Sequence, residues 1–208
     1  LEAELAGLVE GESALVFGSG FLANLGVLGA LLARGDEVYA DKLNHASLID
    51  GVRFSGAQSF RFRHNDPGHL EELLAKSPGT GLKLVVTESV FSMDGDVAPL
   101  APLVAVCRRH GAMLMVDEAH ALGVFGPSGG GLATTLPPDR RPDLVVGTLG
   151  KSLGGYGGFC ACSAELREVL VNLSRPFIFS TALPPATAAA ALAAVRLVRT
   201  TPGWGDKL

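Results

Sequence analysis

The sequence predicts an α/β fold in which a mostly parallel sheet is flanked by helices. Short apolar runs of strand length alternate with helical segments along most of the 208 residues, as they do in repeated strand–helix–strand units. Apolar residues make up 48% of the chain, and the mean hydropathy is +0.33. Both values suit a sheet that helices cover on both faces, because the strands of such a sheet are apolar on both sides.

The first half of the chain alternates strand patterns with helix patterns. In chain order, we expect the strand Ser13–Phe17, the helix Phe21–Ala33, the strand Glu37–Ala40, the helix Ala46–Phe54, the strand Gln58–Arg63, the helix Pro67–Lys76 and the strand Leu82–Thr87. The strands are runs of apolar and β-branched residues. Pro67 suits the first helical position, where the N–H that proline lacks would have no partner inside the helix.

The second half continues the alternation with one long interruption. We expect the helix Pro99–His110, the strands Ala112–Val116, Leu144–Gly147 and Gly158–Cys162, and the helices Ala164–Leu173 and Pro185–Arg199. Gly111 suits the position after the first of these helices, because glycine readily adopts the left-handed conformation that ends a helix. The segment Gly126–Arg141 is rich in glycine and proline, so we expect a loop there.

Composition and charge exclude several classes of function. The net charge is −4 and no basic cluster is present, which gives no electrostatic support to nucleic-acid binding. No apolar run has the length to span a bilayer or the layout of a signal peptide. Cys107, Cys160 and Cys162 form neither a disulfide framework nor a zinc pattern, so we expect small buried side chains, no metal site and a reducing, cytoplasmic environment.

Polar side chains follow two of the buried strands. Asp117 and His120 come after Ala112–Val116, and Thr148 and Lys151 come after Leu144–Gly147. Because ligands of open α/β sheets bind at the carboxyl ends of the strands, we expect these side chains at one rim. A carboxylate for a basic ring nitrogen, a lysine for an aldehyde and a hydroxyl for a phosphate together suit pyridoxal 5′-phosphate.

The segment Gly18–Ala23 is consistent with other kinds of binding site. Its Gly-x-Gly-x-x-Ala pattern lies between a strand and a helix, and Asp41 follows at the spacing of a dinucleotide-binding fingerprint. A dinucleotide-dependent oxidoreductase is therefore an alternative. The same glycines also suit a tight turn that opens a helix, or a helix N-terminus that holds a single phosphate.

Two observations exclude a nucleoside triphosphatase. Met113–His120 looks like a helicase strand with its Asp-Glu-Ala-His box, and Gly150-Lys151-Ser152 looks like the end of a phosphate-binding loop. That loop requires glycine at position 145, which is Val145. The two motifs also occur in the reverse of the helicase order.

Six sequence blocks occur along the chain in a characteristic order: Ser19–Asn24, Asp41–Ser47, Val90–Asp96, Val116–His120, Thr148–Lys151 and Phe179–Pro185. Together they resemble the α-oxoamine synthases, which are fold-type I pyridoxal phosphate enzymes. The resemblance covers essentially the whole chain and implies the large domain of that fold.

The resemblance implies roles for the residues around the cofactor ring. Lys151 would form the Schiff base with the cofactor, and Asp117 would pair with the pyridinium nitrogen. His120 and Ser92 would hydrogen-bond the ring hydroxyl. His45 would stack on the ring and help to position the substrate, which makes Lys151, Asp117 and His45 the expected catalytic residues.

It also implies how the phosphate is held. Gly20 and Phe21 would contribute to the phosphate end of the site together with Thr148. Ser180 and Thr181 resemble a segment that reaches the phosphate in the neighbouring subunit of a homodimer.

The implied reaction is the decarboxylative condensation of an amino acid with an acyl-CoA. Within the family we expect L-alanine and pimeloyl-CoA, the biotin-pathway pair, with glycine and acetyl-CoA as the alternative. The resemblance also places Glu88 near the site.

Family members are longer at both ends. We therefore expect residues 1–208 to be a large domain that is incomplete at its N-terminus and lacks the small C-terminal domain. Leu1–Ala6 looks like the middle of a helix, and a chain without the missing segments is expected to turn over poorly.

Overall fold

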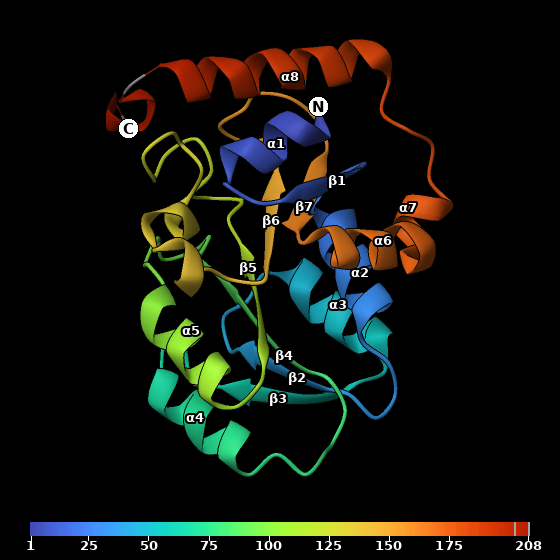
Figure 1. The fold of residues 1–208 in the computed structure, drawn as a ribbon, viewed down its shortest axis with the longest axis vertical. Helices are drawn as coiled ribbons and strands as arrows, with labels where there is room; N and C mark the ends of the chain where they lie inside the picture. Colours follow the sequence, from blue (N-terminus) through green and yellow to red (C-terminus); the bar gives the residue numbers. More distant parts are fainter. Residues whose placement is uncertain (202, 208) are drawn as a thin grey trace.

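The computed structural model of this protein describes residues 1–201 and 203–207. Within these residues the strands form one seven-stranded sheet in the order β1-β7-β6-β5-β4-β2-β3 (Figure 1). The strands are β1 (Ser13–Phe17), β2 (Glu37–Asp41), β3 (Gln58–Phe62), β4 (Lys83–Glu88), β5 (Met113–Asp117), β6 (Leu144–Thr148) and β7 (Gly158–Cys162). Every strand expected from the sequence is confirmed, with ends that shift by at most one residue.

Strands β2 to β6 run parallel, whereas β7 is antiparallel to both of its neighbours, β1 and β6. The sheet is therefore mostly parallel, as expected. At its centre, the register pairs Glu88 with Asp117 and Asp117 with Val146. Polar residues that end neighbouring strands are thus brought to one edge of the sheet.

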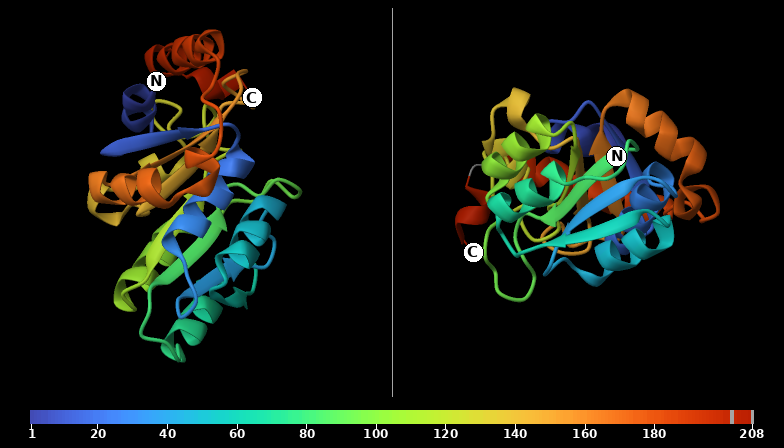
Figure 2. Two further views of the ribbon diagram at one scale, coloured as in Figure 1. Left: turned by 90° about the vertical axis from the view of Figure 1, so that its right-hand side faces the viewer. Right: turned by 90° about the horizontal axis from the view of Figure 1, so that it is seen from below.

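Helices cover both faces of the sheet. They are α1 (Glu2–Leu8), α2 (Gly20–Leu31), α3 (Ala46–Ser55), α4 (Pro67–Ala75), α5 (Leu100–Arg109), α6 (Ala164–Leu173), α7 (Arg175–Ile178) and α8 (Pro185–Thr200). Helices α2, α3, α6 and α7 lie on one side, and α4 and α5 lie on the other (Figures 1 and 2). Helix α8 lies beside α1 across one end of the molecule. None of the described helices has both the length and the apolar character that crossing a membrane requires.

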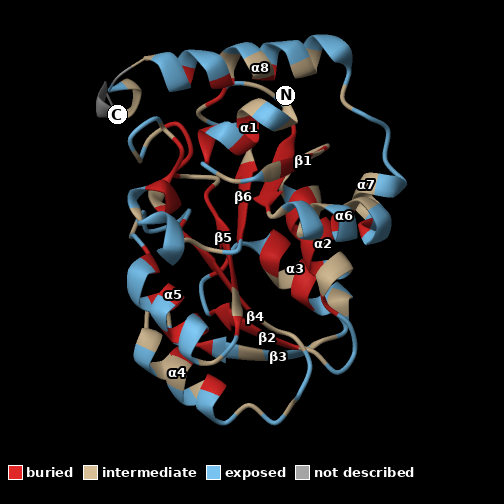
Figure 3. Ribbon diagram, viewed as in Figure 1, coloured by how far each residue is buried: buried red, intermediate tan, exposed pale blue. Residues whose placement is uncertain are grey.

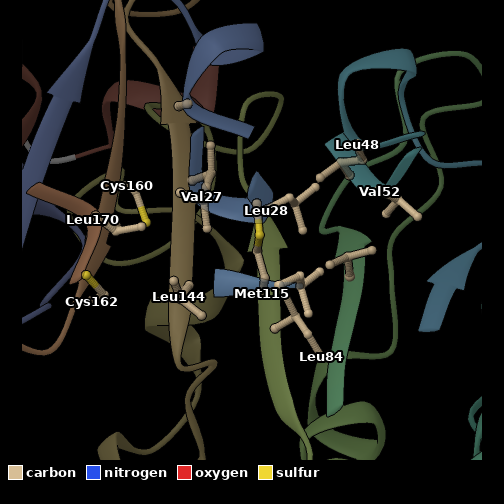
Figure 4. Close-up of a cluster of buried hydrophobic side chains, with 14 of the residues drawn as sticks. Val27, Leu28, Leu48, Val52, Leu84, Met115, Leu144, Cys160, Cys162 and Leu170 are labelled. Atoms are coloured by element: carbon tan, nitrogen blue, oxygen red, sulfur yellow. The ribbon is translucent and has the colours of Figure 1, made fainter. Parts of the chain in front are cut away.

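The buried residues concentrate in the strands and on the inner faces of the helices (Figure 3). On the face under α2 and α3, Leu28 and Leu48 pack over Leu84 and Met115 (Figure 4). Cys160 and Cys162 of β7 belong to the same buried cluster, and all three cysteines are free thiols. The cysteines therefore act as small core side chains, as expected.

Local signals explain several helix ends. Asp66 accepts a hydrogen bond from the His69 N–H and caps α4, with Pro67 at the first helical position. Gly111, just beyond α5, has a φ of +61°, which is the left-handed conformation expected there. Ser19 caps α2 through its hydroxyl, which accepts a hydrogen bond from the Leu22 N–H.

Two segments differ from expectation. The segment Gly126–Arg141 is not wholly a loop, because it contains the short 3-10 helices η1 (Leu132–Thr135) and η2 (Pro138–Arg140). The carboxylate of Glu118 accepts hydrogen bonds from two N–H groups in the first turn of η1 and so stabilises it. Helix α7 was not expected either, since a single turn is too short to show a helical period.

Candidate active site

The candidate site is a cavity of about 250 Å³ at the carboxyl ends of β5 and β6. Its walls come from the start of α2, the start of α3, the end of β4 and the segments that follow β5 and β6. The lining residues are Ser19, Gly20, Phe21, Asn24, His45, Ser47, Glu88, Asp117, Ala119, His120, Thr148 and Lys151. The structure thus brings together Asp117, His120, Thr148 and Lys151, the four side chains that the strand-end argument placed at one rim.

Asp117 is the last residue of β5 and is only 6% exposed. Its Oδ1 accepts a hydrogen bond from the Ala119 N–H at 2.9 Å, and its Oδ2 accepts one from Asn24 Nδ2 at 2.7 Å. A carboxylate has about four acceptor positions. Because each oxygen receives one donor from the described residues, the carboxylate retains capacity for a further N–H donor from the cavity.

Lys151 and His120 meet at the mouth of the cavity, where the lysine Nζ lies 2.7 Å from His120 Nε2. While Lys151 is protonated its ammonium only donates hydrogen bonds, and Nε2 then accepts. Burial lowers the pKa of Lys151, against the opposing pull of the Asp117 and Glu88 carboxylates. Burial together with the nearby Lys151 charge lowers the pKa of His120. Both groups are therefore shifted towards their neutral forms, which suits proton transfer.

Glu88 lies beside Asp117 in the register and is 2% exposed. It accepts a hydrogen bond from the backbone N–H of His45 at 2.6 Å. Burial and the negative charge of Asp117 raise the pKa of Glu88 to about 7. Its Oε2 lies 3.9 Å from His120 Nδ1. Glu88 thus ties the start of α3 to the end of β4 while sharing the cavity with His120.

The start of α2 presents backbone N–H groups that could bind a phosphate. The N–H groups of Gly20 and Phe21 belong to the first helical turn, where helix geometry provides no acceptor. A Cβ on Gly20 would lie 3.2 Å from Thr148 Cβ, and a Cβ on Gly158 would lie 2.5 Å from the Gly20 nitrogen. Glycines therefore allow the helix start, the end of β6 and β7 to pack closely.

The structure does not agree with the hypothesis that this turn and Asp41 bind a dinucleotide. Asp41 is buried, and its carboxylate accepts hydrogen bonds from the N–H groups of Leu43 and Asn65 and lies 2.9 Å from His64 Nδ1. It holds neighbouring loops together, so the acid that a ribose would need is already engaged.

Three predicted residues lie outside this cavity. Ser92 is exposed and is not among the residues that line the cavity. Ser180 and Thr181 line a separate cavity of about 690 Å³ with residues of α1, β1 and α7. Their expected contact belongs to a dimer, so their role stays a prediction.

Three polar residues that line the site, Ser19, Asn24 and Ser47, were missed by reasoning from the sequence. Asn24 and Ser47 are each 1% exposed and are hydrogen-bonded to each other at 2.9 Å. The available signal for Asn24 was a polar side chain among apolar residues on the buried side of a helix. Buried polar groups of this kind usually have a specific partner.

The donor set fits pyridoxal phosphate. Asp117 offers a carboxylate for a ring N–H, Lys151 offers an amine for an aldehyde, and the start of α2 offers N–H groups for a phosphate. A cavity near the lower end of the range for drug-sized ligands, about 300 Å³, suits one small cofactor. Dinucleotides require a longer cleft.

The fold and this donor set suit a domain that binds pyridoxal phosphate, and the comparison with known families agrees. The sequence matches the aminotransferase class I and II family over residues 1–200, and the chain belongs to that family.

Among curated relatives, it is 55% identical to the 8-amino-7-oxononanoate synthase of Anaeromyxobacter sp. (strain K), over 97% of this chain and 50% of that protein. It is 54% identical to the synthase of the same name from Geobacter sulfurreducens, over 95% of this chain and 51% of that protein. The chain therefore spans about half the length of the curated relatives it matches. These relatives confirm the expected resemblance to α-oxoamine synthases.

Solved structures support the same fold. A serine palmitoyltransferase from S. paucimobilis, with a bound PLP–myriocin aldimine, is 41% identical with a TM-score of 0.91, over 96% of this chain and 52% of that one. The 8-amino-7-oxononanoate synthase of Francisella tularensis is 33% identical with a TM-score of 0.82, over 96% and 58% of the two chains. The expected fold-type I architecture is thereby confirmed.

Proposed function

We propose that this chain holds pyridoxal 5′-phosphate, with Lys151 as its covalent attachment point, and that the protein containing it condenses an amino acid with an acyl-CoA and releases CO₂. The observation that carries the proposal is the convergence of Lys151, His120 and Asp117 on one cavity beside a helix N-terminus. The relatives named 8-amino-7-oxononanoate synthase support L-alanine and pimeloyl-CoA as the substrates. A cytoplasmic homodimer in biotin biosynthesis belongs to the same proposal.

The bound cofactor would supply an electron sink for negative charge that develops at the substrate Cα. Asp117 accepts the hydrogen bond of the ring N–H and so keeps the positive charge on the ring. The lowered pKa of Lys151 leaves more of its amine unprotonated, which allows Nζ to remove the Cα proton. His120 orients that amine through Nε2. His45, on the cavity wall, stacks on the ring and keeps water from the reacting carbon.

The remaining assignments extend this proposal. His120 and Ser92 hydrogen-bond the ring hydroxyl, while Gly20, Phe21 and Thr148 hold the phosphate. In the dimer, Ser180 and Thr181 reach the phosphate of the partner. Residues 1–208 form the cofactor-binding large domain, and the segments that complete the substrate site belong to the longer protein.

The decisive experiment is a titration of the chain with pyridoxal phosphate, followed by visible absorption, borohydride reduction and peptide mapping. We expect a new absorption band and a reduced adduct on Lys151. Lys151→Ala removes the adduct, whereas Lys76→Ala, at the exposed end of α4, retains it. An adduct on another lysine, or binding of NAD without an adduct, contradicts the proposal.

Substrate identity is tested next. L-Alanine, glycine and L-serine are added separately to the loaded protein, and the amino acid that shifts the band at the lowest concentration is the substrate. CoA release is then measured with pimeloyl-, acetyl- and palmitoyl-CoA on the protein extended to the length of its relatives. We expect L-alanine and pimeloyl-CoA to be preferred. A preference for L-serine and palmitoyl-CoA would instead follow the structural likeness to serine palmitoyltransferase.

A further inference from the structure

A single side-chain amide connects two groups of the candidate site. Asn24, on α2, is buried between the end of β5 and the start of α3. Its Nδ2 lies 2.7 Å from Asp117 Oδ2 and 2.9 Å from Ser47 Oγ. The side-chain nitrogen of Asn24 therefore links α2 to the end of β5 and to the start of α3.

The chemistry of these partners determines the orientation of the amide. A carboxylate accepts hydrogen bonds only, so the atom 2.7 Å from Asp117 Oδ2 must be the NH₂ group of Asn24. That group has two hydrogens, one for each partner. Asn24 Oδ1 is buried and has no hydrogen-bond partner among the described residues. The donor side of the amide is thus satisfied at the expense of its acceptor side.

Ser47 carries the connection to His45. Its Oγ accepts from Asn24 Nδ2, which leaves the single hydroxyl proton for His45 Nδ1 at 2.8 Å. The Ser47 N–H also donates to His45 Nδ1, at 3.2 Å. With two donors directed at it, Nδ1 accepts, and the proton of the neutral ring lies on Nε2.

We propose that Asn24 is a positioning residue that holds the Asp117 carboxylate and, through the hydroxyl of Ser47, the imidazole of His45 as one hydrogen-bonded unit. The inference rests on the proposed function, because Asp117 and His45 are the groups that would face the cofactor ring. Asn24 would act by fixing the orientation of these two side chains. Second-layer hydrogen bonds of this kind fix the orientation of the groups that touch a ligand.

One arm of the test uses the apo chain and needs no cofactor. The ring nitrogens of His45 are followed by ¹⁵N NMR and assigned with His45→Gln. In the unsubstituted chain, we expect the proton on Nε2 and a hydrogen-bonded Nδ1. Ser47→Ala removes a donor to Nδ1, and Asn24→Ala frees the hydroxyl to rotate away, so both should move the Nδ1 resonance.

The second arm measures the dissociation constant for pyridoxal phosphate. Asn24→Ala should weaken binding about tenfold, since a hydrogen bond to a charged group is lost. Ser47→Ala should weaken it less, because Asn24 still holds Asp117. Asn24→Asp has nearly the same shape but places an oxygen against Asp117 Oδ2, so we expect it to bind at least as weakly as Asn24→Ala.

Tyr39→Phe is the matched control. It removes a buried hydroxyl that donates to a buried carboxylate, that of Glu37, at 2.7 Å, and it should change neither the His45 resonances nor the affinity. If Asn24→Ala leaves the Nδ1 resonance in place, or Asn24→Asp binds like the unsubstituted chain, the proposal is wrong. Ser47→Ala removes one oxygen only, so the link to His45 is tested even if Asn24→Ala does not fold. If the unsubstituted chain binds no cofactor, the proposed function fails while the NMR arm still decides the role of Asn24.

Discussion

At the scale of single residues, three neighbouring acids differ in their surroundings. Asp117 faces the cavity with one donor on each oxygen. Glu88 is buried beside it and has its pKa raised. Glu118 is fully buried and accepts hydrogen bonds from Ser89 Oγ and from the N–H groups of Leu132 and Ala133. Asp117 and Glu88 both line the cavity, whereas Glu118 is committed to the segment that begins η1.

Asp117→Asn tests the proposed role of Asp117 as the acid that faces the cofactor ring. The amide keeps the shape of the side chain but removes the charge that would stabilise a protonated ring nitrogen. We expect the affinity for pyridoxal phosphate to fall about tenfold to a hundredfold, the range for a hydrogen bond to a charged group. Equilibrium dialysis measures it. Asp139→Asn, at an exposed aspartate of η2, is the control and should bind normally; equal binding by both variants would contradict the role of Asp117.

Glu88→Gln tests the raised pKa. In the folded apo chain Glu88 has a pKa of about 7, against an ordinary value of 4.5. Between these values the folded state binds more protons than the unfolded state, so the contribution of Glu88 to stability is lost as pH rises from about 4.5 to 7. Linkage places this contribution at about 3 kcal/mol as an upper bound.

Urea unfolding at pH 5 and pH 8 measures the effect. The free energy of unfolding should fall between these pH values by more in the unsubstituted chain than in Glu88→Gln. Parallel pH dependence in the two proteins would show that Glu88 titrates normally.

Single residues also show what reasoning from the sequence can reach. Lys151, Asp117 and Thr148 are predicted because each follows an apolar strand, and His45 because it stands in a family motif; the structure places all four on one cavity, and their roles stay predictions. Asn24 was not assigned a role, since its importance lies in contacts with Asp117 and Ser47, which are distant in the sequence. A buried polar side chain can be suspected from its pattern, but its partner cannot.

At the scale of elements, the site depends on how closely the start of α2 approaches β7. A Cβ on Gly158 would lie 2.5 Å from the Gly20 nitrogen, which is a backbone atom and cannot move alone. Either β7 or the first turn of α2 must shift to accept a side chain. The N–H groups proposed to hold a phosphate belong to that turn.

Gly158→Ala should therefore weaken both folding and cofactor binding. We expect a loss of about 1–3 kcal/mol in the free energy of unfolding, typical of overpacking, and weaker binding of pyridoxal phosphate. Gly29→Ala is the contrasting variant on α2 itself, because a Cβ there meets nothing within 4 Å. It should stabilise the chain by about 0.5–1 kcal/mol. Urea unfolding measures both, and unchanged binding by Gly158→Ala would contradict this account of the phosphate site.

Element positions were largely predictable, whereas short irregular helices were not. Strands and long helices carry their own periodicity and end signals, as Pro67 and Gly111 show. The helix η1 forms because Glu118, from another part of the chain, captures its first N–H groups. The sequence of Gly126–Arg141 contains no pattern from which its hydrogen bonds to Glu118 could be predicted.

At the scale of the whole molecule, stability comes from buried clusters on both faces of the sheet. One cluster includes Leu28 under α2 and α3, and another includes Leu114 against α4 and α5. The central strands take part in both clusters because successive side chains of a strand point to opposite faces. The two faces should therefore unfold together.

Leu28→Ala and Leu114→Ala test this cooperativity. Both leucines are at most 1% exposed, so each substitution should cost about 2–5 kcal/mol. The slope of the urea transition should not change, as expected for one cooperative unit. Leu173→Ala, at a leucine that is 57% exposed, should stay within about 0.5 kcal/mol. Separate transitions in either core variant would show that the two faces unfold independently.

The sequence by itself determined the α/β class, the order of the strands and helices along the chain, and the residues that follow the buried strands. These are local properties, because hydrophobic period, helix-ending residues and motif spacing all act within a short stretch of chain. It also carried the resemblance that pointed to the family.

Only the tertiary structure decided which of these residues meet. The sheet register places Glu88 beside Asp117, and the packing of α2 places Asn24 against both Asp117 and Ser47. The packed structure also engages the Asp41 carboxylate in hydrogen bonds with neighbouring loops, which argues against a dinucleotide site. Burial and shifted pKa values arise from neighbours brought together by folding, so they follow from the packed structure and cannot be read from the order of residues.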